Sequence, residues 1–298
     1  MRRSKVFVLV AVLVLSGLAT ATIAFADDFW LVPNAFRVEV GDDVVLRGQT
    51  SSQFPTSRTA VAVDRVAEAK LISDRGDVAL KGLSVQGRSL VIRDRPAGAG
   101  QYAVAVSLHP RSVRESADGF RRYLDAEGAA AARARVEREG LLTGKDSVTR
   151  RYAKYAKTLV QVGTGGARAF AQPAGHVIEF VPLRDPTALR AGDTLELRLL
   201  FRGEPLAGIP VHADVVALDV DRDALSGSAH AGPGGGAAAS AFTPDEGGIV
   251  RVPLKRGGMW SIRTIHVTQA RVGSGADWDT HWATLVFALD EPPTRQRK

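Results

Sequence analysis

The sequence predicts a mainly β protein with two Ig-like antiparallel β-sandwich domains, the first of which carries a helical insertion. Three observations support this. The chain has 298 residues, of which 45% are hydrophobic and 24% charged. This is an ordinary globular composition, and the length suits two sandwich domains. Short alternating segments recur between turn residues, as in sandwiches. One internal stretch is instead rich in Ala, Arg and Glu, which favour helix.

The first 26 residues have the plan of a secretory signal peptide. Basic residues at 2, 3 and 5 precede an apolar run over 6–18, and Ala24 and Ala26 form a small-x-small cleavage site. We therefore expect the mature chain to begin at Asp27 and to be periplasmic or secreted. An uncleaved anchor is the alternative, because 6–25 nearly has the length of a membrane span. No second apolar run of that length follows, so no span is expected after cleavage.

The first sandwich domain is predicted over residues 27–168. The alternating residues 36–40 and 44–48 flank the turn residues Gly41, Asp42 and Asp43. Further short strands are expected at 67–72, 83–85, 89–92 and 102–108. A helical excursion over about 114–157 follows, with helices predicted at 118–126, 129–139 and 148–157. In the third helix, Val148, Tyr152, Tyr155 and Leu159 have roughly helical spacing. The basic residues of this excursion are expected on solvated helix faces.

The second Ig-like sandwich domain is predicted over residues 169–290. Strands are expected at 176–181, 195–201, 210–218, 249–254, 259–267 and 280–289. Residues 226–240 are a Gly/Ala-rich low-complexity segment, and residues 291–298 are a polar tail.

Composition and motifs exclude several classes of function. The chain has no cysteine, so thiolate metal sites and cysteine nucleophiles are excluded. It contains no Gly-x-Ser-x-Gly, His-Glu-x-x-His or Walker motif. The net charge is +7, and loss of the three leader cations leaves +4, with both signs interspersed. We therefore expect a binding protein and not an enzyme, and we expect no nucleic acid partner.

Two places could hold a metal. His266 and His281 lie on the last two predicted strands, and symmetric pairing about the intervening loop would make them cross-strand neighbours that could share a cation. Asp279 could add an oxygen ligand. Alternatively, both histidines form only local hydrogen bonds. The second place is the mature terminus, where the α-amino group, Asp27 and Asp28 could chelate a divalent metal; alternatively, it is a frayed end that Phe29 and Trp30 anchor.

Seven segments carry a resemblance to a known family, and they run in order through nearly the whole mature chain. They are DFWLVP at 28–33, RYAKYAKTLVQVG at 151–163, PLRDP at 182–186, GEPLAG at 203–208, GGIVRVPL at 247–254, WSIRTIH at 260–266 and DWDTHWATL at 277–285. In these the chain resembles the exported domain of unknown function 4198 family, described as a periplasmic component associated with cobalt or nickel uptake. The resemblance implies nickel or cobalt as the metal and a membrane transporter complex as the partner.

One departure from the family pattern affects the metal site. Members of the family typically have a histidine before Asp-Phe-Trp, and here that place is taken by Asp27. Carboxylate is a harder ligand and binds nickel or cobalt less well than imidazole. His266 matches a family histidine, whereas His281 stands where an aromatic residue is expected. We therefore expect any metal at the last hairpin first.

Two functions follow as hypotheses. The first is an exported protein that serves or buffers divalent nickel or cobalt. The second is a metal-free cell-envelope module that binds a protein or glycan partner through a sandwich face.

Overall fold

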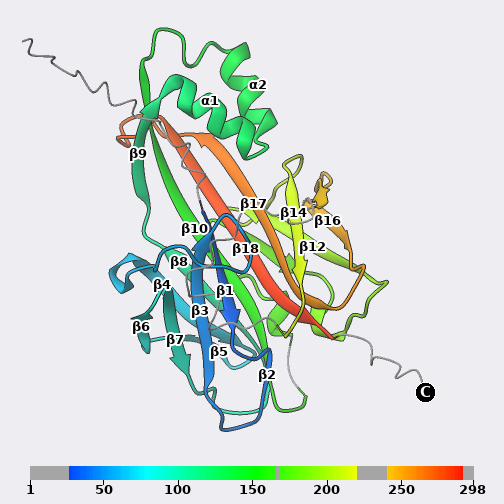
Figure 1. The fold of residues 1–298 in the computed structure, drawn as a ribbon. Coiled ribbons are helices and arrows are strands. Elements are labelled where there is room, and N and C mark those ends of the chain that lie inside the picture. Colours follow the sequence, from blue (N-terminus) through cyan, green and yellow to red (C-terminus); the bar gives the residue numbers. More distant parts are fainter. Residues whose placement is uncertain (1–26, 166–167, 220–239, 291–298) are drawn as a thin grey trace, which may run out of the picture.

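The computed structural model describes residues 27–165, 168–219 and 240–290. The predicted signal peptide, most of the low-complexity segment and the polar tail lie outside these residues. The chain is mainly β, with mostly antiparallel, Ig-like sheets and a helical insertion, which confirms the predicted fold class (Figure 1). None of the helices in the described ranges is long and apolar enough to cross a membrane.

The N-terminal sheet contains four antiparallel strands in the order β1-β3-β7-β6. Their bounds are β1 Asp28–Pro33, β3 Val44–Ser51, β7 Ser89–Asp94 and β6 Leu83–Gln86. All six residues of β1 are buried. Phe29 and Leu31 pack into one hydrophobic cluster, and Trp30 and Val32 into another. This strand is therefore covered on both faces, which explains its uninterrupted apolar run.

A long ten-stranded sheet forms the middle of the molecule. Its main path is β15-β14-β17-β18-β10-β8-β4-β5, and β2 and β9 also pair with β10. The bounds are β2 Arg37–Val38, β4 Val66–Ser73, β5 Gly76–Ala79, β8 Gly100–Leu108, β9 Arg111–Ser116, β10 Ser147–Val162, β14 Val211–Val216, β15 Ser240–Phe242, β17 Gly258–Gln269 and β18 Trp278–Leu289. A parallel pairing of β10 with β18 joins the first half of the chain to the second.

The third sheet consists of β11 Ile178–Pro182, β12 Thr194–Phe201, β13 Glu204–Pro205 and β16 Ile249–Pro253. It packs on one face of the long sheet through a cluster that includes Leu197, Ile262 and Leu285. The N-terminal sheet packs on the opposite face through Leu31, Val104 and Val160. The two sandwiches are thus stacked back to back on one shared sheet, which crosses the predicted domain boundary at residue 168.

Two of the three predicted helices are present, α1 Ala117–Ala126 and α2 Ala130–Arg138. The Ser116 hydroxyl accepts a hydrogen bond from the Gly119 amide and caps α1. Phe120 and Leu124 of α1 pack against Trp278 and Trp282 of β18. In Figure 1 both helices lie at one end of the long strands. Short 3₁₀ turns occur at Val63–Arg65, Ala169–Ala171 and Pro186–Ala188.

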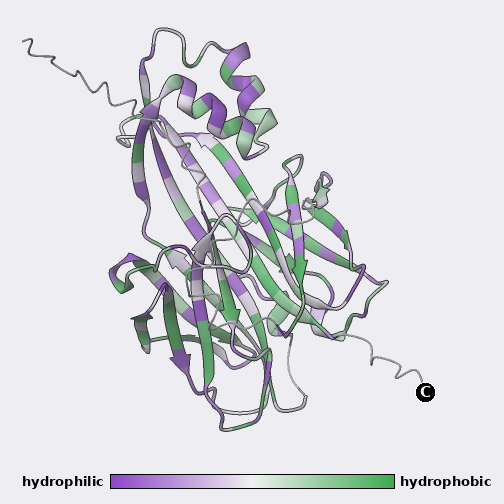
Figure 2. Cartoon of the chain, in the orientation of Figure 1, coloured by the Kyte–Doolittle hydropathy of each residue, from purple (hydrophilic) through white to green (hydrophobic). Residues whose placement is uncertain are grey.

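The predicted third helix at 148–157 is wrong: these residues belong to the sixteen-residue strand β10. The helical excursion therefore ends at Arg138 and does not extend to 157. β10 pairs with β9 and β8 on one side and with β18 on the other, so ladder hydrogen bonds satisfy its backbone. Tertiary pairing has overridden the helical spacing of its apolar residues. Figure 2 shows hydrophilic segments on the part of β10 nearest the helices.

Candidate functional site

His266 and His281 are directly opposite each other in the antiparallel hairpin of β17 and β18. The predicted register of these strands is therefore confirmed. Because side chains alternate between the faces of a strand, both histidines share the face that carries Ile262 and Ala283. These two residues belong to the cluster under the third sheet. The histidine pair thus lies on the third-sheet side of the long sheet.

Aromatic rings surround the two histidines. The Phe201 ring centroid is 4.6 Å from that of His266 and 5.3 Å from that of His281. The Tyr155 ring centroid is 6.4 Å from that of His281 and 5.2 Å from that of His176. Both imidazoles therefore pack against the Phe201 ring of β12 in the third sheet, and His176 packs against Tyr155.

The histidines of this cluster are poorly solvated. Burial lowers the pKa of His266, of His281 and of His176 to about 4, so all three imidazoles are neutral at pH 7. Both ring nitrogens of His281 are buried, and neither has a hydrogen-bond partner among the described residues. A neutral imidazole has a nitrogen lone pair available for a metal.

Asp279 lies two residues before His281 on β18 and points to the same face. Its carboxylate is engaged by Arg151, whose Nε and Nη2 donate to it at 2.7 and 2.9 Å. This bidentate pair neutralises the carboxylate and occupies both of its oxygens. Asp279 is therefore near the histidine pair, but both of its carboxylate oxygens already bind Arg151.

Asp27 and Asp28 lie on the other side of the long sheet. Asp28 is buried, and its carboxylate is 3.5 Å from Arg263 Nε. Arg263 lies three residues before His266 on β17, so the Arg263 side chain points to the opposite face of the sheet. Burial raises the pKa of Asp28 to about 6, against the opposing effect of Arg263. The structure thus does not bring these two aspartates to the histidine pair.

Within the described ranges, no group of three or more His, Asp or Glu side chains could hold a metal ion. Of the five predicted ligands, only His266 and His281 are paired, and Asp279 is next to them. A neutral imidazole has one nitrogen lone pair, so His266 and His281 could offer at most one ligand each.

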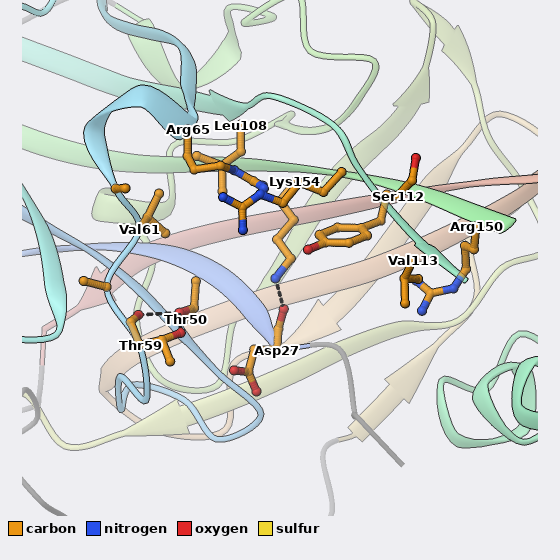
Figure 3. A pocket seen from close by; sticks show the side chains of 14 residues that line it. Asp27, Thr50, Thr59, Val61, Arg65, Leu108, Ser112, Val113, Arg150 and Lys154 are labelled. Atoms are coloured by element: carbon orange, nitrogen blue, oxygen red, sulfur yellow. Dashed lines mark hydrogen bonds between the residues drawn. The ribbon is translucent and has the colours of Figure 1, made fainter. Parts of the chain in front are cut away.

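Sequence reasoning missed a cavity of about 540 Å³ between β10 and the segment that joins β3 to β4. Its basic lining residues are Arg65, Arg111, Arg150 and Lys154, and its one acid is Asp27. Figure 3 shows the Arg65 and Lys154 side chains extending into the same space above Asp27. Arg150 and Lys154 were expected on a solvated helix face; both are instead buried on β10.

A family model described as a domain of unknown function, DUF4198, matches residues 24–268. The chain belongs to this family. The match covers most of both sandwiches and includes His266, whereas His281 lies beyond its end. No protein of curated function matches the sequence significantly.

The DUF4198 chain is also similar to several solved structures, all with low TM-scores. The D0-D1 domain of intimin is 9% identical, with 88% of this chain and 97% of that one covered and a TM-score of 0.21. A DUF4785 family protein from Legionella pneumophila is 7% identical, with 64% and 39% covered and a TM-score of 0.24. The Escherichia coli adhesin FdeC is 13% identical, with 89% and 64% covered and a TM-score of 0.22. These likenesses carry no functional argument.

Proposed function

We propose that this DUF4198 protein is exported and binds divalent nickel or cobalt at His266 and His281. There it delivers the metal to a membrane transporter complex or buffers its concentration. The observation that carries the proposal is the opposed histidine pair, in which both nitrogens of His281 are buried without a partner among the described residues. The leader of residues 1–26 supports a periplasmic or secreted location.

The chemistry of the pair suits these metals. Imidazole is a favoured ligand of nickel and related divalent metals, which keep further coordination positions for water or a second ligand. Two protein ligands hold a metal less firmly than a closed four-ligand site, so the ion remains exchangeable. Exchange is what a carrier or buffer needs, whereas the partly buried rings of Phe201 and Tyr155 limit access by solvent.

Calorimetric titration of residues 27–298 with nickel and cobalt tests the proposal. We expect binding at micromolar metal, and we expect the His266→Ala/His281→Ala double variant to lose it. His109→Ala is the matched control, because His109 is exposed on the loop after β8 and should leave binding unchanged. Absence of binding at micromolar metal, or equal binding by the double variant, would refute the site and favour the metal-free envelope module.

The pH dependence sharpens this test. A proton competes with the metal for an imidazole nitrogen only near or below the pKa of that imidazole. Since the pKa values of His266 and His281 are lowered to about 4, binding should persist down to about pH 5. Loss of binding near pH 6.5, the range of an ordinary histidine, would contradict the role of these half-buried rings.

A further inference from the structure

The cavity beside β10 has an unusual charge balance. Four cations line it, and Asp27 is the one acid among its lining residues. The Asp27 carboxylate is itself 3.7 Å from the Arg58 guanidinium, which is not part of the lining. Asp27 can offset only part of the charge of the four lining cations, so the lining residues themselves carry more positive than negative charge.

Strand β10 supplies two of these cations. Arg150, Tyr152 and Lys154 alternate along the strand and share the face that carries Ala156 and Val160 into the N-terminal core. Arg150 is 4% exposed and Lys154 is 8% exposed. A charged side chain at this depth requires compensation. Burial lowers the pKa of Lys154, against the opposing effect of the acids Asp28, Asp27 and Glu127.

The existing partners leave several donors unused. Arg150 Nε donates to Glu115 Oε1 at 2.8 Å, but Arg150 Nη1 is buried and has no partner among the described residues. Arg65 Nε and Nη1 are likewise buried without a described partner. Lys154 Nζ donates to the backbone oxygen of Asp27 and has further donor capacity. Figure 3 shows Arg65 and Lys154 near the middle of the view and Arg150 at its right.

We propose that this cavity binds a small anion bearing several carboxylate or phosphate oxygens. Arg65, Arg150 and Lys154 bind these oxygens directly, and the exposed Arg111 guides the anion in at the rim. Buried guanidinium donors without partners are costly, and oxyanions are the acceptors whose geometry matches them. About 540 Å³ is within the size range of small-molecule pockets and holds a compact organic acid.

The site is distinct from the histidine pair. Consecutive residues of a strand point to opposite faces, so Lys154 lines the cavity whereas Tyr155 packs toward His281. The positive lining would also repel a free divalent cation. The anion site thus goes beyond the proposed metal site and can be tested separately from it.

The test is thermal unfolding and calorimetric titration of residues 27–298 in metal-depleted Tris buffer of low ionic strength. The probes are citrate for carboxylates and pyrophosphate for phosphates, with glycerol as an uncharged control. We expect at least one anion to raise the unfolding temperature and to bind with an affinity that falls as salt is added. The probe that binds more tightly shows whether the cavity prefers carboxylate or phosphate oxygens. If neither probe binds at tens of millimolar, the proposal is wrong.

Variants locate the binding. Arg65→Gln and Arg111→Gln should each lower the affinity for the anion. For Arg65→Gln we expect a loss of about tenfold or more, as expected for loss of one charge-assisted hydrogen bond. Arg111 is exposed, so its variant tests the cavity even if Arg65→Gln folds poorly. Arg122→Gln on the exposed side of α1 removes the same charge and should have no effect. Equal weakening by all three variants would show non-specific attraction and overturn the proposal. His266→Ala/His281→Ala should leave the anion affinity unchanged.

Discussion

Lys157 and Glu179 form a buried ion pair that ties β10 to the third sheet, and its removal should destabilise the protein strongly. Their side chains are 2% and 4% exposed, and Lys157 Nζ lies 2.8 Å from Glu179 Oε2. The Ala174 and Gly175 amides also donate to this carboxylate, at 2.7 and 2.9 Å. Lys157→Met would leave the carboxylate buried with only these two donors. We expect a loss of about 3 kcal/mol, the low end for a broken buried pair.

The double variant Lys157→Met/Glu179→Leu gives the sharper comparison. It has no charge at positions 157 and 179, but the Ala174 and Gly175 amides lose their acceptor, at a cost of about 1 kcal/mol each. The double variant should therefore be about 2 kcal/mol less stable than the natural protein, and more stable than Lys157→Met alone. Additive losses in the two single variants would refute the account.

Urea denaturation followed by tryptophan fluorescence measures these differences, because all four tryptophans are buried. Arg251→Met is the matched control, since Arg251 pairs with Glu196 across two neighbouring strands of the third sheet but is 58% exposed. Its variant should change stability much less. A loss below about 1 kcal/mol in Lys157→Met would contradict the inference that the buried charge needs its partner.

Two further variants test the environment of β1 and the helical layer. The pKa of Asp28 is about 6 in the folded protein against 3.8 in an exposed carboxyl. The folded state therefore holds the proton more tightly, and stability falls as the pH rises between these values. In Asp28→Asn, the free energy of unfolding from urea denaturation should fall less between pH 4 and 7 than in the natural protein. The same dependence on pH in both proteins would contradict this assignment. Phe120→Ala should cost about 3–5 kcal/mol in the same assay, because Phe120 is 0% exposed and its ring centroid is 5.1 Å from that of Trp278. A loss below about 1 kcal/mol would contradict this.

Local patterns were enough to predict much of the fold. Alternating apolar residues indicated most of the strands, and a stretch rich in Ala, Arg and Glu indicated α1 and α2. The symmetric sequence around the last turn even predicted that His266 and His281 are opposed. These features depend on neighbours in sequence, for which spacing and turn residues carry the information.

The error at β10 had a physical cause. Val148, Tyr152, Tyr155 and Leu159 have helical spacing, but in the strand they point to two faces and contact two different layers. A strand that is buried on both faces has no simple alternation to detect. Its basic residues looked like a solvated helix face for the same reason. The cavity lined by Arg150 and Lys154 could therefore not be predicted, because it requires the pairing of β10 with β9 and its contact with a distant loop.

The shared sheet makes the two halves of the chain depend on each other. Residues 150–158 of β10 pair with residues 278–286 of β18 in a parallel ladder. If the second half were absent, β10 would become an exposed edge strand with unpaired backbone groups. The ladder also fixes both proposed sites, because β18 carries His281 and β10 carries Lys154. The histidine pair and the cationic cavity thus lie on opposite faces of one ladder, although each belongs to a different sandwich.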